Sequence, residues 1–394
     1  MSQQLISRSP DLQRLRDEGY DVEIRAGYLL IKNVPYVNYR REVKLGTLVS
    51  ELSLSGDVTS APGTHVAYFI GDHPCHKDGS AIDKIRHQSI QQKFGQDITV
   101  DHSFSSKPLS GRYADYYEKM TTYVAIISSP ARALNPGVTA QTFPVIEPEE
   151  GGSVFNYIDT ASSRAGINVV TGKLELGKVA IVGLGGTGSY VLDLVAKTPV
   201  REIHLFDGDK FLQHNAFRSP GAPSINELRE APQKVTYLAN LYSRMRKGIV
   251  PHAGYVDASN VDHLVGMDFV FLSLDEGGAK KLVVEKLEGE GVAFIDVGMG
   301  MYQVNESLAG VLRVTTSTPG QRDHVRAKGR IPFSGGDGNN EYSRNIQIAD
   351  LNALNAALAV VKWKKLCGFY QDLEREHHST YTVDGNIITN EDNT

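Results

Sequence analysis

The residues best suited to chemistry lie between Gly183 and Asp275, and the first of them form the glycine-rich turn GLGGTG at 183–188. Gly183 permits a tight turn, Gly185 lets a phosphate approach the backbone, and Gly188 lets the next helix pack closely on the preceding strand. The unpaired amides and the positive dipole end of that helix then face an anion. We therefore predict a nucleotide phosphate site at Gly183, Gly185, Gly186 and Gly188.

An acidic residue closes the next predicted strand. Asp207 lies twenty-four residues after Gly183, where an acid would hydrogen-bond the ribose hydroxyls of a nucleotide. This position fits NAD and ATP equally well. A cap of a helix or turn is the structural alternative for Asp207.

The following stretch carries polar and cationic residues that favour a triphosphate. Asn215 and Arg218 lie three residues apart, so they would face the same way on a helical turn, and Lys234 opens the next predicted helix. The glycine turn alone can hold the two phosphates of a dinucleotide, whereas a triphosphate needs further cationic partners. Taken singly, each of these residues fits a solvated surface position, but their joint spacing favours ATP.

Two more acids end predicted strands. Asp275 closes the strand at 268–275, and a carboxylate at this place suits Mg²⁺, which one or two acids hold together with phosphate oxygens. Asp275 could instead cap the helix that begins at Gly277. Asp296 fits a cap and a site equally well.

The order of strands and helices predicts how these residues meet. From Gly177 onward, apolar strand segments alternate with helical segments, which is typical of an α/β fold with a Rossmann-like, doubly wound, mostly parallel sheet. In such sheets ligands bind at the carboxyl ends of the strands, where the candidate residues fall. We predict strands at 179–182, 201–207, 268–275 and 292–298, and helices at 189–197, 232–245, 277–290 and 346–366. The polar loop 317–342 and a frayed tail at 384–394 complete this region.

The first 150 residues follow a different pattern, which predicts a separate α+β domain at 1–150. A linker rich in proline, glycine and acids at 135–152 leads into the second domain, placed at 155–394. Cys75 lies in a loop beside His73 and His76, which could lower its pKa and make it a nucleophile or part of a metal site; an inert loop cysteine is the alternative. We predict helices at 10–19, 82–94 and 113–127, and a meander of strands that includes 20–26, 28–34 and 64–71.

Composition narrows the class of protein. The chain of 394 residues has 41% hydrophobic and 22% charged residues, and its net charge of -5 gives no general attraction to nucleic acid or anionic lipid. No apolar run approaches the ~18 residues of a membrane span, and two cysteines fit a reducing compartment. We therefore expect a cytoplasmic protein without a nucleic-acid or membrane partner.

Five features in this order resemble the adenylating domain of ubiquitin-activating enzymes and of their bacterial relatives ThiF and MoeB, over about residues 156–370. They are GLGGTG, the 207–209 sequence DGD, Asn215-x-x-Arg218, Gln233-Lys234 and Asp275. The resemblance implies that ATP is bound by the glycines, Asp207, Asp209, Asn215, Arg218, Gln233 and Lys234, and Mg²⁺ by Asp275. Arg164 is similar in position to an arginine that this family often inserts from a partner subunit. Arg218, Lys234, Asp275 and Arg164 would then be the catalytic residues.

The implied activity is ATP- and Mg²⁺-dependent adenylation of the C-terminal carboxylate of a ubiquitin-like protein by a homodimer, in a bacterial conjugation or defence pathway. The chain lacks the paired CxxC motifs common among these relatives, and the 317–342 loop contains no cysteine. The adenylate would therefore be the final product or pass to the thiol of a downstream carrier. The basic residues at 322–330 either fold over the substrate tail or belong to a solvated linker.

The N-terminal domain resembles the ubiquitin-conjugating or RWD-like fold, with His73-Pro74 matching the His-Pro element of that fold. A catalytic cysteine would be expected at about 82–83, and Ile82 and Asp83 stand there, so the resemblance implies an inactive relative that recruits partners. Three other functions stay open: a ThiF-like enzyme that adenylates a peptide or acts on tRNA, a nucleotide-binding scaffold without turnover, and an NAD-dependent dehydrogenase. The dehydrogenase would leave Asn215, Arg218, Lys234 and Asp275 without a role.

Overall fold

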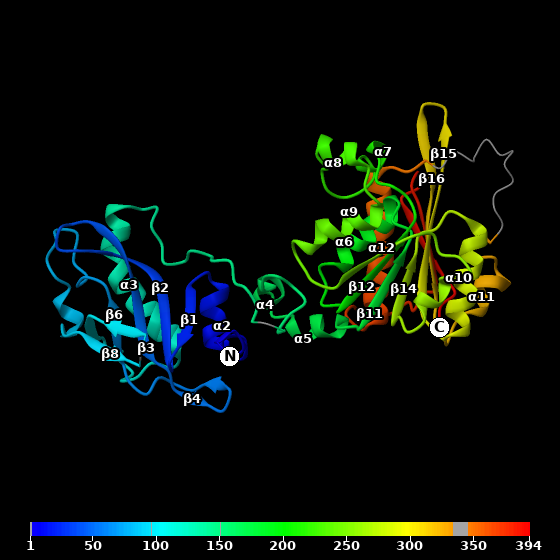
Figure 1. Ribbon diagram of the computed structural model, residues 1–394. Helices are drawn as coiled ribbons and strands as arrows, with labels where there is room; N and C mark the ends of the chain where they lie inside the picture. The colour runs from blue at the N-terminus through cyan, green and yellow to red at the C-terminus, as the bar shows by residue number, and fades with distance from the viewer. Residues whose placement is uncertain (1, 96, 150, 334–345) are drawn as a thin grey trace. The chain divides into compact units, whose positions relative to one another are not determined.

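The computed structural model describes residues 2–95, 97–149, 151–333 and 346–394, which form two compact units (Figure 1). The N-terminal unit comprises Met1–Glu150 and Ile158–Gly166, and the C-terminal unit comprises Gly151–Tyr157 and Ile167–Thr394. Each unit has a hydrophobic core of its own. No helix in the described ranges is both long enough and apolar enough to span a membrane.

The N-terminal unit is built on an antiparallel sheet with the strand order β1-β2-β3-β6-β10-β7. Its strands are β1 Asp21–Arg25, β2 Tyr28–Val37, β3 Val43–Glu51, β6 Val66–Ile70, β7 Arg86–Gln88 and β10 His102–Ser105, with two small pairs, β4 Leu54–Ser55 with β5 Val58–Thr59 and β8 Gln92–Phe94 with β9 Ile98–Val100. Its helices are α1 Ser2–Arg8, α2 Pro10–Asp17, α3 Tyr116–Leu134 and α4 Thr160–Arg164.

Helix α3 supplies much of this core. Asp115 caps it by accepting a hydrogen bond from the Glu118 amide at 2.7 Å. Met120, Tyr123 and Ile127 recur at helical spacing, and all three are fully buried in the core of the unit. The predicted meander and the helices at 10–19 and 113–127 are therefore present.

The predicted helix at 82–94 is wrong. A short 3-10 turn, Asp83–Ile85, is followed by β7, which pairs with β10 as an exposed edge strand, and then by β8. Only Ile82 and Ile85 are buried in this stretch, so a helix here would have no continuous apolar face to bury, and strand pairing decides the local structure.

The C-terminal unit contains an eight-stranded mixed sheet with the order β13-β12-β11-β14-β15-β16-β17-β18. The first five strands in this order are parallel, and the last three add antiparallel pairs. The predicted α/β, Rossmann-like class is confirmed. The strands are β11 Lys178–Val182, β12 Glu202–Asp207, β13 Ile249–Ala253, β14 Phe269–Leu272, β15 Phe294–Val304, β16 Ser307–Ser317, β17 His378–Thr382 and β18 Ile387–Glu391.

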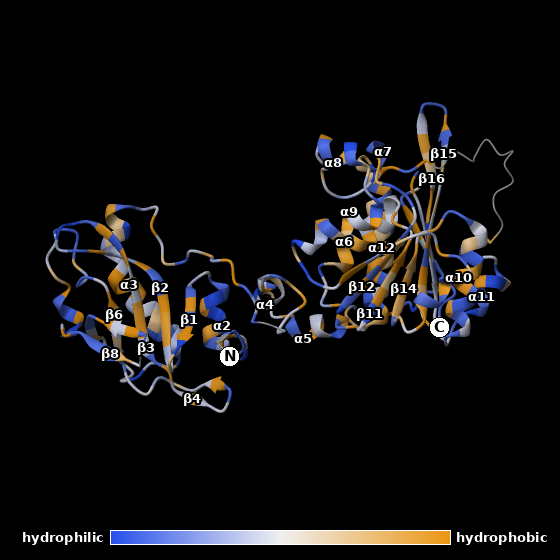
Figure 2. Cartoon of the chain, in the orientation of Figure 1, coloured by the Kyte–Doolittle hydropathy of each residue, from blue (hydrophilic) through white to orange (hydrophobic). Residues whose placement is uncertain are grey.

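Helices cover both faces of this sheet, and the apolar residues of the strands lie between them (Figure 2). Residues of α6, α9 and α12 share one core cluster, which includes Leu192, Leu238 and Trp363. Residues of α10 and α11 share the other, which includes Val283 and Val325. The helices are α5 Asn168–Thr171, α6 Gly186–Val195, α7 Gln213–Ala216, α8 Ile225–Glu230, α9 Lys234–Ser243, α10 Gly277–Gly289, α11 Asp323–Ala327 and α12 Ala349–Leu366, with 3-10 turns at Gly172–Leu174 and Val261–Leu264.

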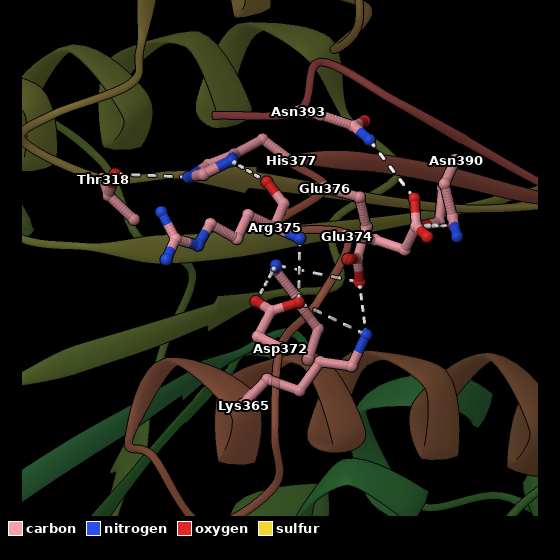
Figure 3. A network of polar contacts seen from close by, with 11 residues as sticks. Thr318, Lys365, Asp372, Glu374, Arg375, Glu376, His377, Asn390 and Asn393 are labelled. Atoms are coloured by element: carbon pink, nitrogen blue, oxygen red, sulfur yellow. Dashed lines mark hydrogen bonds and ion pairs between the residues drawn. The ribbon is translucent and has the colours of Figure 1, made fainter.

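The end of the chain is ordered, so the predicted frayed tail is wrong. Strand β18 pairs with β17, and β17 extends the main sheet through β16. Figure 3 shows how the segment before β17 is held: the Lys365 ammonium lies 2.9 Å from Glu376 and 3.5 Å from Asp372, and His377 lies beside Thr318.

The predicted 317–342 loop is only partly irregular, because α11 lies within it. Its residues 334–342 fall outside the described part of the chain. The basic residues at 322–330 are described, and Arg322, Lys328 and Arg330 contact Glu288 or Asp392. That they fold over a substrate stays a prediction.

Candidate nucleotide site

A cavity of about 670 Å³ lies at the carboxyl ends of β11, β12 and β14, beside the first turns of α10. We call it the nucleotide cavity. Its volume is in the usual range for a small-molecule site. It is lined by Val182, Gly183, Gly185, Phe206, Asp207, Asp209, Arg218, Lys234, Gly254, Tyr255, Val256, Asp257, Ser273, Leu274, Asp275, Glu276, Gly278, Ala279, Leu282 and Gln347.

The glycine turn has the geometry that its sequence predicts. Gly183 has a φ of 88°, which favours glycine, and a Cβ there would lie 2.3 Å from the Ser273 carbonyl oxygen. A Cβ on Gly188 would lie 1.9 Å from the Gly183 carbonyl oxygen, so α6 can approach β11 only with glycine at this place. A Cβ on Gly185 would meet no protein atom within 4 Å, and Gly185 lines the cavity. Gly186 packs instead against Asn352 of α12.

Asp207 holds this turn in place. Its carboxylate is buried at the end of β12 and accepts hydrogen bonds from the Leu184 amide at 2.7 Å and the Asp209 amide at 2.8 Å. Backbone amides thus occupy both carboxylate oxygens. Asp207 therefore fixes the wall of the cavity, and its predicted contact with a ribose stays a prediction.

Lys234 and Asp209 form an ion pair across the cavity wall. The Lys234 ammonium lies 2.6 Å from Asp209 and 3.5 Å from Asp207, and the lysine side chain is 5% exposed. Asp209 also accepts a hydrogen bond from the Tyr255 hydroxyl. The hydrogen bonds from Lys234 and Tyr255 lower the pKa of Asp209 below its usual value, so this acid is ionised at neutral pH.

Arg218 carries a polar atom without a partner. Its Nε is buried and has no hydrogen-bond partner among the described residues, while the residue lines the cavity. A buried donor without a partner is costly, so an anion at this place would be stabilised. Asn215, three residues earlier, does not line the cavity. Its Oδ1 accepts a hydrogen bond from the Leu212 amide at 2.8 Å and caps α7, so its predicted contact with phosphate stays a prediction.

Gln233 stands just before α9. With its amide nitrogen turned toward the 208–209 turn, Gln233 donates to the carbonyl oxygens of Gly208 and Asp209 at 3.2 and 3.0 Å. It therefore supports the turn that carries Asp209 rather than lining the cavity itself.

Asp275 lies in the cavity wall, three residues after β14 ends. The residue that caps α10 is not Asp275 but its neighbour Glu276, which accepts hydrogen bonds from the Gly278 and Ala279 amides. Among the described residues, no group of three or more His, Cys, Asp or Glu side chains is placed to hold a metal ion. Mg²⁺ at Asp275 would therefore need phosphate oxygens as further ligands, which is its common mode of binding.

The lining charges also fit a divalent cation. Five carboxylates and two cationic side chains line the cavity, so its formal charge is −3. An ATP polyanion would be repelled by this charge unless a cation accompanied it. The donor set thus suits ATP together with Mg²⁺ better than ATP alone.

Three other candidates lie elsewhere. Arg164 belongs to the N-terminal unit, with its guanidinium 5.8 Å from the centre of the Phe143 ring, and its predicted catalytic function stays a prediction. Asp296 is fully buried and pairs with Lys280 and Arg313, so it is neither a helix cap nor exposed to the cavity.

Cys75 is 3% exposed, and its thiol donates to the His73 carbonyl oxygen at 3.3 Å. Burial and the nearby Asp72 raise the pKa of this thiol, contrary to what a nucleophile needs.

The sequence reasoning missed the wall formed by Tyr255, Val256 and Asp257. These residues follow β13, a strand that was not predicted because Pro251 and His252 interrupt its apolar pattern. Once β13 is placed beside β12 in the parallel sheet, the rule that ligands bind at carboxyl strand ends points directly to Tyr255.

Two family comparisons cover most of the chain. Residues 10–160 match a domain of unknown function, DUF6791, and residues 163–321 match the ThiF family. No curated protein sequence matches the chain.

Several solved structures match part of the chain at low sequence identity. Escherichia coli MccB with ATP is 19% identical, covers 62% of this chain and 73% of its own, and has a TM-score of 0.45. The Microcin C7 biosynthetic enzyme MccB with N-formylated MccA is 19% identical, with 59% and 70% covered and a TM-score of 0.45. PaaA is 16% identical, with 57% and 75% covered and a TM-score of 0.40. The range that matches the ThiF family, residues 163–321, contains every residue that lines the nucleotide cavity except Gln347.

Proposed function

We propose that the C-terminal unit uses ATP and Mg²⁺ to adenylate the C-terminal carboxylate of a ubiquitin-like protein. The observation that carries the proposal is that Arg218, Lys234 and Asp275 lie in one cavity with the glycine turn, inside a ThiF family domain. NAD would need the turn and the acid of β12 but neither of the two cations.

The proposed reaction joins two anions. A carboxylate oxygen of the substrate attacks the α-phosphorus of ATP, a new oxygen–phosphorus bond forms, and the bond to the bridging oxygen of the β-phosphate breaks. Pyrophosphate leaves with the electron pair, and no proton is transferred. The chain therefore needs no general base.

The residues of the cavity would supply positioning and charge. Lys234 is oriented by Asp209 and Asp207, and Arg218 lines the same cavity. Cations fixed in this way stabilise charge that develops on the phosphates without reorganising. Asp275 would hold Mg²⁺, which screens the phosphates from the carboxylates of the wall.

The match of residues 163–321 to the ThiF family supports adenylation, and the proposal of a ubiquitin-like substrate rests on the resemblance of the sequence motifs to ubiquitin-activating enzymes. We propose that the N-terminal unit recruits a protein partner, and that the protein acts as a homodimer in which Arg164 completes the site of the other subunit. A monomeric mass in light scattering would contradict the dimer.

The test is the exchange of radiolabelled pyrophosphate into ATP by the full chain. We expect exchange with Mg²⁺ and the small-protein fraction of the native host, and loss of exchange in Lys234→Met. Exchange with short peptides alone would favour a peptide substrate. NADH oxidation without exchange would contradict adenylation altogether.

A further inference from the structure

A buried ionic cluster lies behind the wall of the nucleotide cavity. Asp296, on β15, is 0% exposed and lies between two cations. The Lys280 ammonium of α10 is 3.0 Å from its Oδ1, as a close ion pair rather than an aligned hydrogen bond. The Arg313 guanidinium of β16 donates to its Oδ2 at 2.6 Å. One carboxylate therefore joins a helix to two strands.

A second tier of contacts holds Arg313. Its Nη1 donates to Thr315 Oγ1 at 2.7 Å and to the Arg330 carbonyl oxygen at 2.9 Å. The Arg330 side chain in turn pairs with Glu391 and Asp392, both at 2.9 Å. The cluster thus extends from α10 to the last strand of the sheet, and Asp296 is fixed from the strand side.

Stability alone is a weak reason for this cluster. Removing charges from water costs several kcal/mol per ion, and buried ion pairs often contribute no more stability than apolar residues of similar volume. The neighbours on α10, Val283 and Val284, show that the helix packs on the sheet through apolar side chains elsewhere. What the ion pair adds is a fixed position for the start of the helix.

The start of α10 is the part that faces the cavity. Gly278, Ala279 and Leu282 line the cavity, and Lys280 lies between them, pointing to the sheet. A shift of this turn would move the cavity wall directly.

We propose that Lys280 and Asp296 are positioning residues that fix the first turns of α10 as a wall of the nucleotide site. The proposal rests on the proposed function, because it takes ATP as the ligand of the cavity. Neither residue touches the ligand: both act through the cavity-lining residues of the helix.

The charges around Asp296 point to a variant that leaves no buried charge without a partner. At its inner end the cluster places two cations, Lys280 and Arg313, on the single carboxylate of Asp296, so Lys280→Met leaves Asp296 paired one-to-one with Arg313. No buried charge is left without a partner. The loss of the Lys280 contact can therefore be separated from a loss of stability, whereas Asp296→Asn would leave the buried Lys280 and the partly buried Arg313 without their carboxylate partner.

Lys281 provides the matched control. It is the next residue on the same helix, its side chain is 59% exposed, and its contact with Glu285 is 4.0 Å long. Lys281→Met removes the same charge from the same helix but touches no wall of the cavity.

The experiment compares the full chain with both variants by calorimetric titration of ATP in the presence of Mg²⁺ and by thermal melting. We expect Lys280→Met to weaken ATP binding tenfold or more with little change in Tm, and Lys281→Met to match the wild type in both. Unchanged ATP affinity in Lys280→Met, with or without a lower Tm, would overturn the proposal.

A second variant at the same position is available in case Lys280→Met does not fold. If Lys280→Met does not fold, Lys280→Gln is measured with the same expectations, and failure of both to fold would overturn the proposal by showing that the pair serves the fold. The proposed function and the positioning by Lys280 and Asp296 are tested by different results. A wild-type chain that does not bind ATP refutes the proposed function, whereas the ratio of variant to wild-type ATP affinity tests only the positioning.

Discussion

Asp207 accepts a hydrogen bond from the Leu184 amide at 2.7 Å, so the acid that ends β12 holds the glycine turn that follows β11. The same carboxylate binds the Asp209 amide and lies beside Lys234. A single buried side chain therefore sets the distance between the phosphate turn and the lysine that would bind phosphate.

We expect Asp207→Asn to weaken ATP binding by about tenfold or more. An asparagine can accept one amide hydrogen bond through its oxygen, but its nitrogen then faces the second donor, which is left buried without a partner at a cost of about 1–3 kcal/mol. Calorimetric titration with ATP measures the effect. Glu202→Gln, at the exposed start of the same strand, is the control, and equal affinity of both variants would contradict the prediction.

Tyr255 gives a prediction that separates its ring from its hydroxyl. The ring lies against Gly208, where an added Cβ would come within 2.8 Å of it, and the hydroxyl bonds to Asp209. We expect Tyr255→Phe to weaken ATP binding only about two- to threefold, and Tyr255→Ala about tenfold, because only the latter removes the wall. Equal losses in the two variants would show that the hydroxyl alone matters.

Cys75 should not carry an acyl group. Its thiol is buried, and its raised pKa keeps it protonated at neutral pH. We expect Cys75→Ser to retain full pyrophosphate exchange, and mass spectrometry of the wild type under turnover to find no thiol-sensitive adduct at this residue. An adduct at Cys75 that thiols release would refute this.

The buried Lys119 should make the stability of the N-terminal unit depend on pH. This lysine is 0% exposed, donates to Ser50 Oγ at 2.8 Å and to the Thr64 carbonyl oxygen at 2.9 Å, and burial lowers its pKa from 10.5 to about 8. The folded state thus releases the proton at lower pH than the unfolded state. Between about pH 8 and pH 10.5 the unfolded state binds more protons, so stability rises with pH in this window.

The measurement is thermal or denaturant unfolding of the full chain against pH, with Lys119→Met as the comparison. We expect the stability of the wild type relative to the variant to rise by roughly 2–3 kcal/mol from pH 7 to pH 10. A difference that stays constant with pH would mean that Lys119 keeps an ordinary pKa in the folded protein.

The sequence was most informative where local pattern and function coincide. The turn at 183–188 lies between an apolar strand and a helix, and contacts with Ser273 and within the turn itself require glycine at Gly183 and Gly188. The rule for carboxyl strand ends predicted Asp275, and the joint spacing of Asn215, Arg218 and Lys234 predicted a phosphate site; the structure brings Arg218, Lys234 and Asp275 to one cavity, but not Asn215.

The wrong predictions concern segments whose local structure is determined by tertiary contacts. Residues 86–88 form a strand because β10 offers an edge, and β18 is ordered because β17 pairs with it. Tyr255 and Lys280 belong to no motif: the position of Tyr255 depends on β13, and that of Lys280, on α10, depends on the carboxylate of Asp296 on β15, sixteen residues away. Such relations are set by packing rather than by local sequence.

The most direct test of the account is calorimetric titration of the full chain with ATP and, separately, with NAD in a buffer that contains Mg²⁺. We predict a single ATP site per chain, affinity that falls tenfold or more in Arg218→Met and on removal of Mg²⁺ with EDTA, and no binding of NAD. Binding of NAD in place of ATP, or ATP affinity unchanged in Arg218→Met, would contradict the assignment of this cavity to a triphosphate.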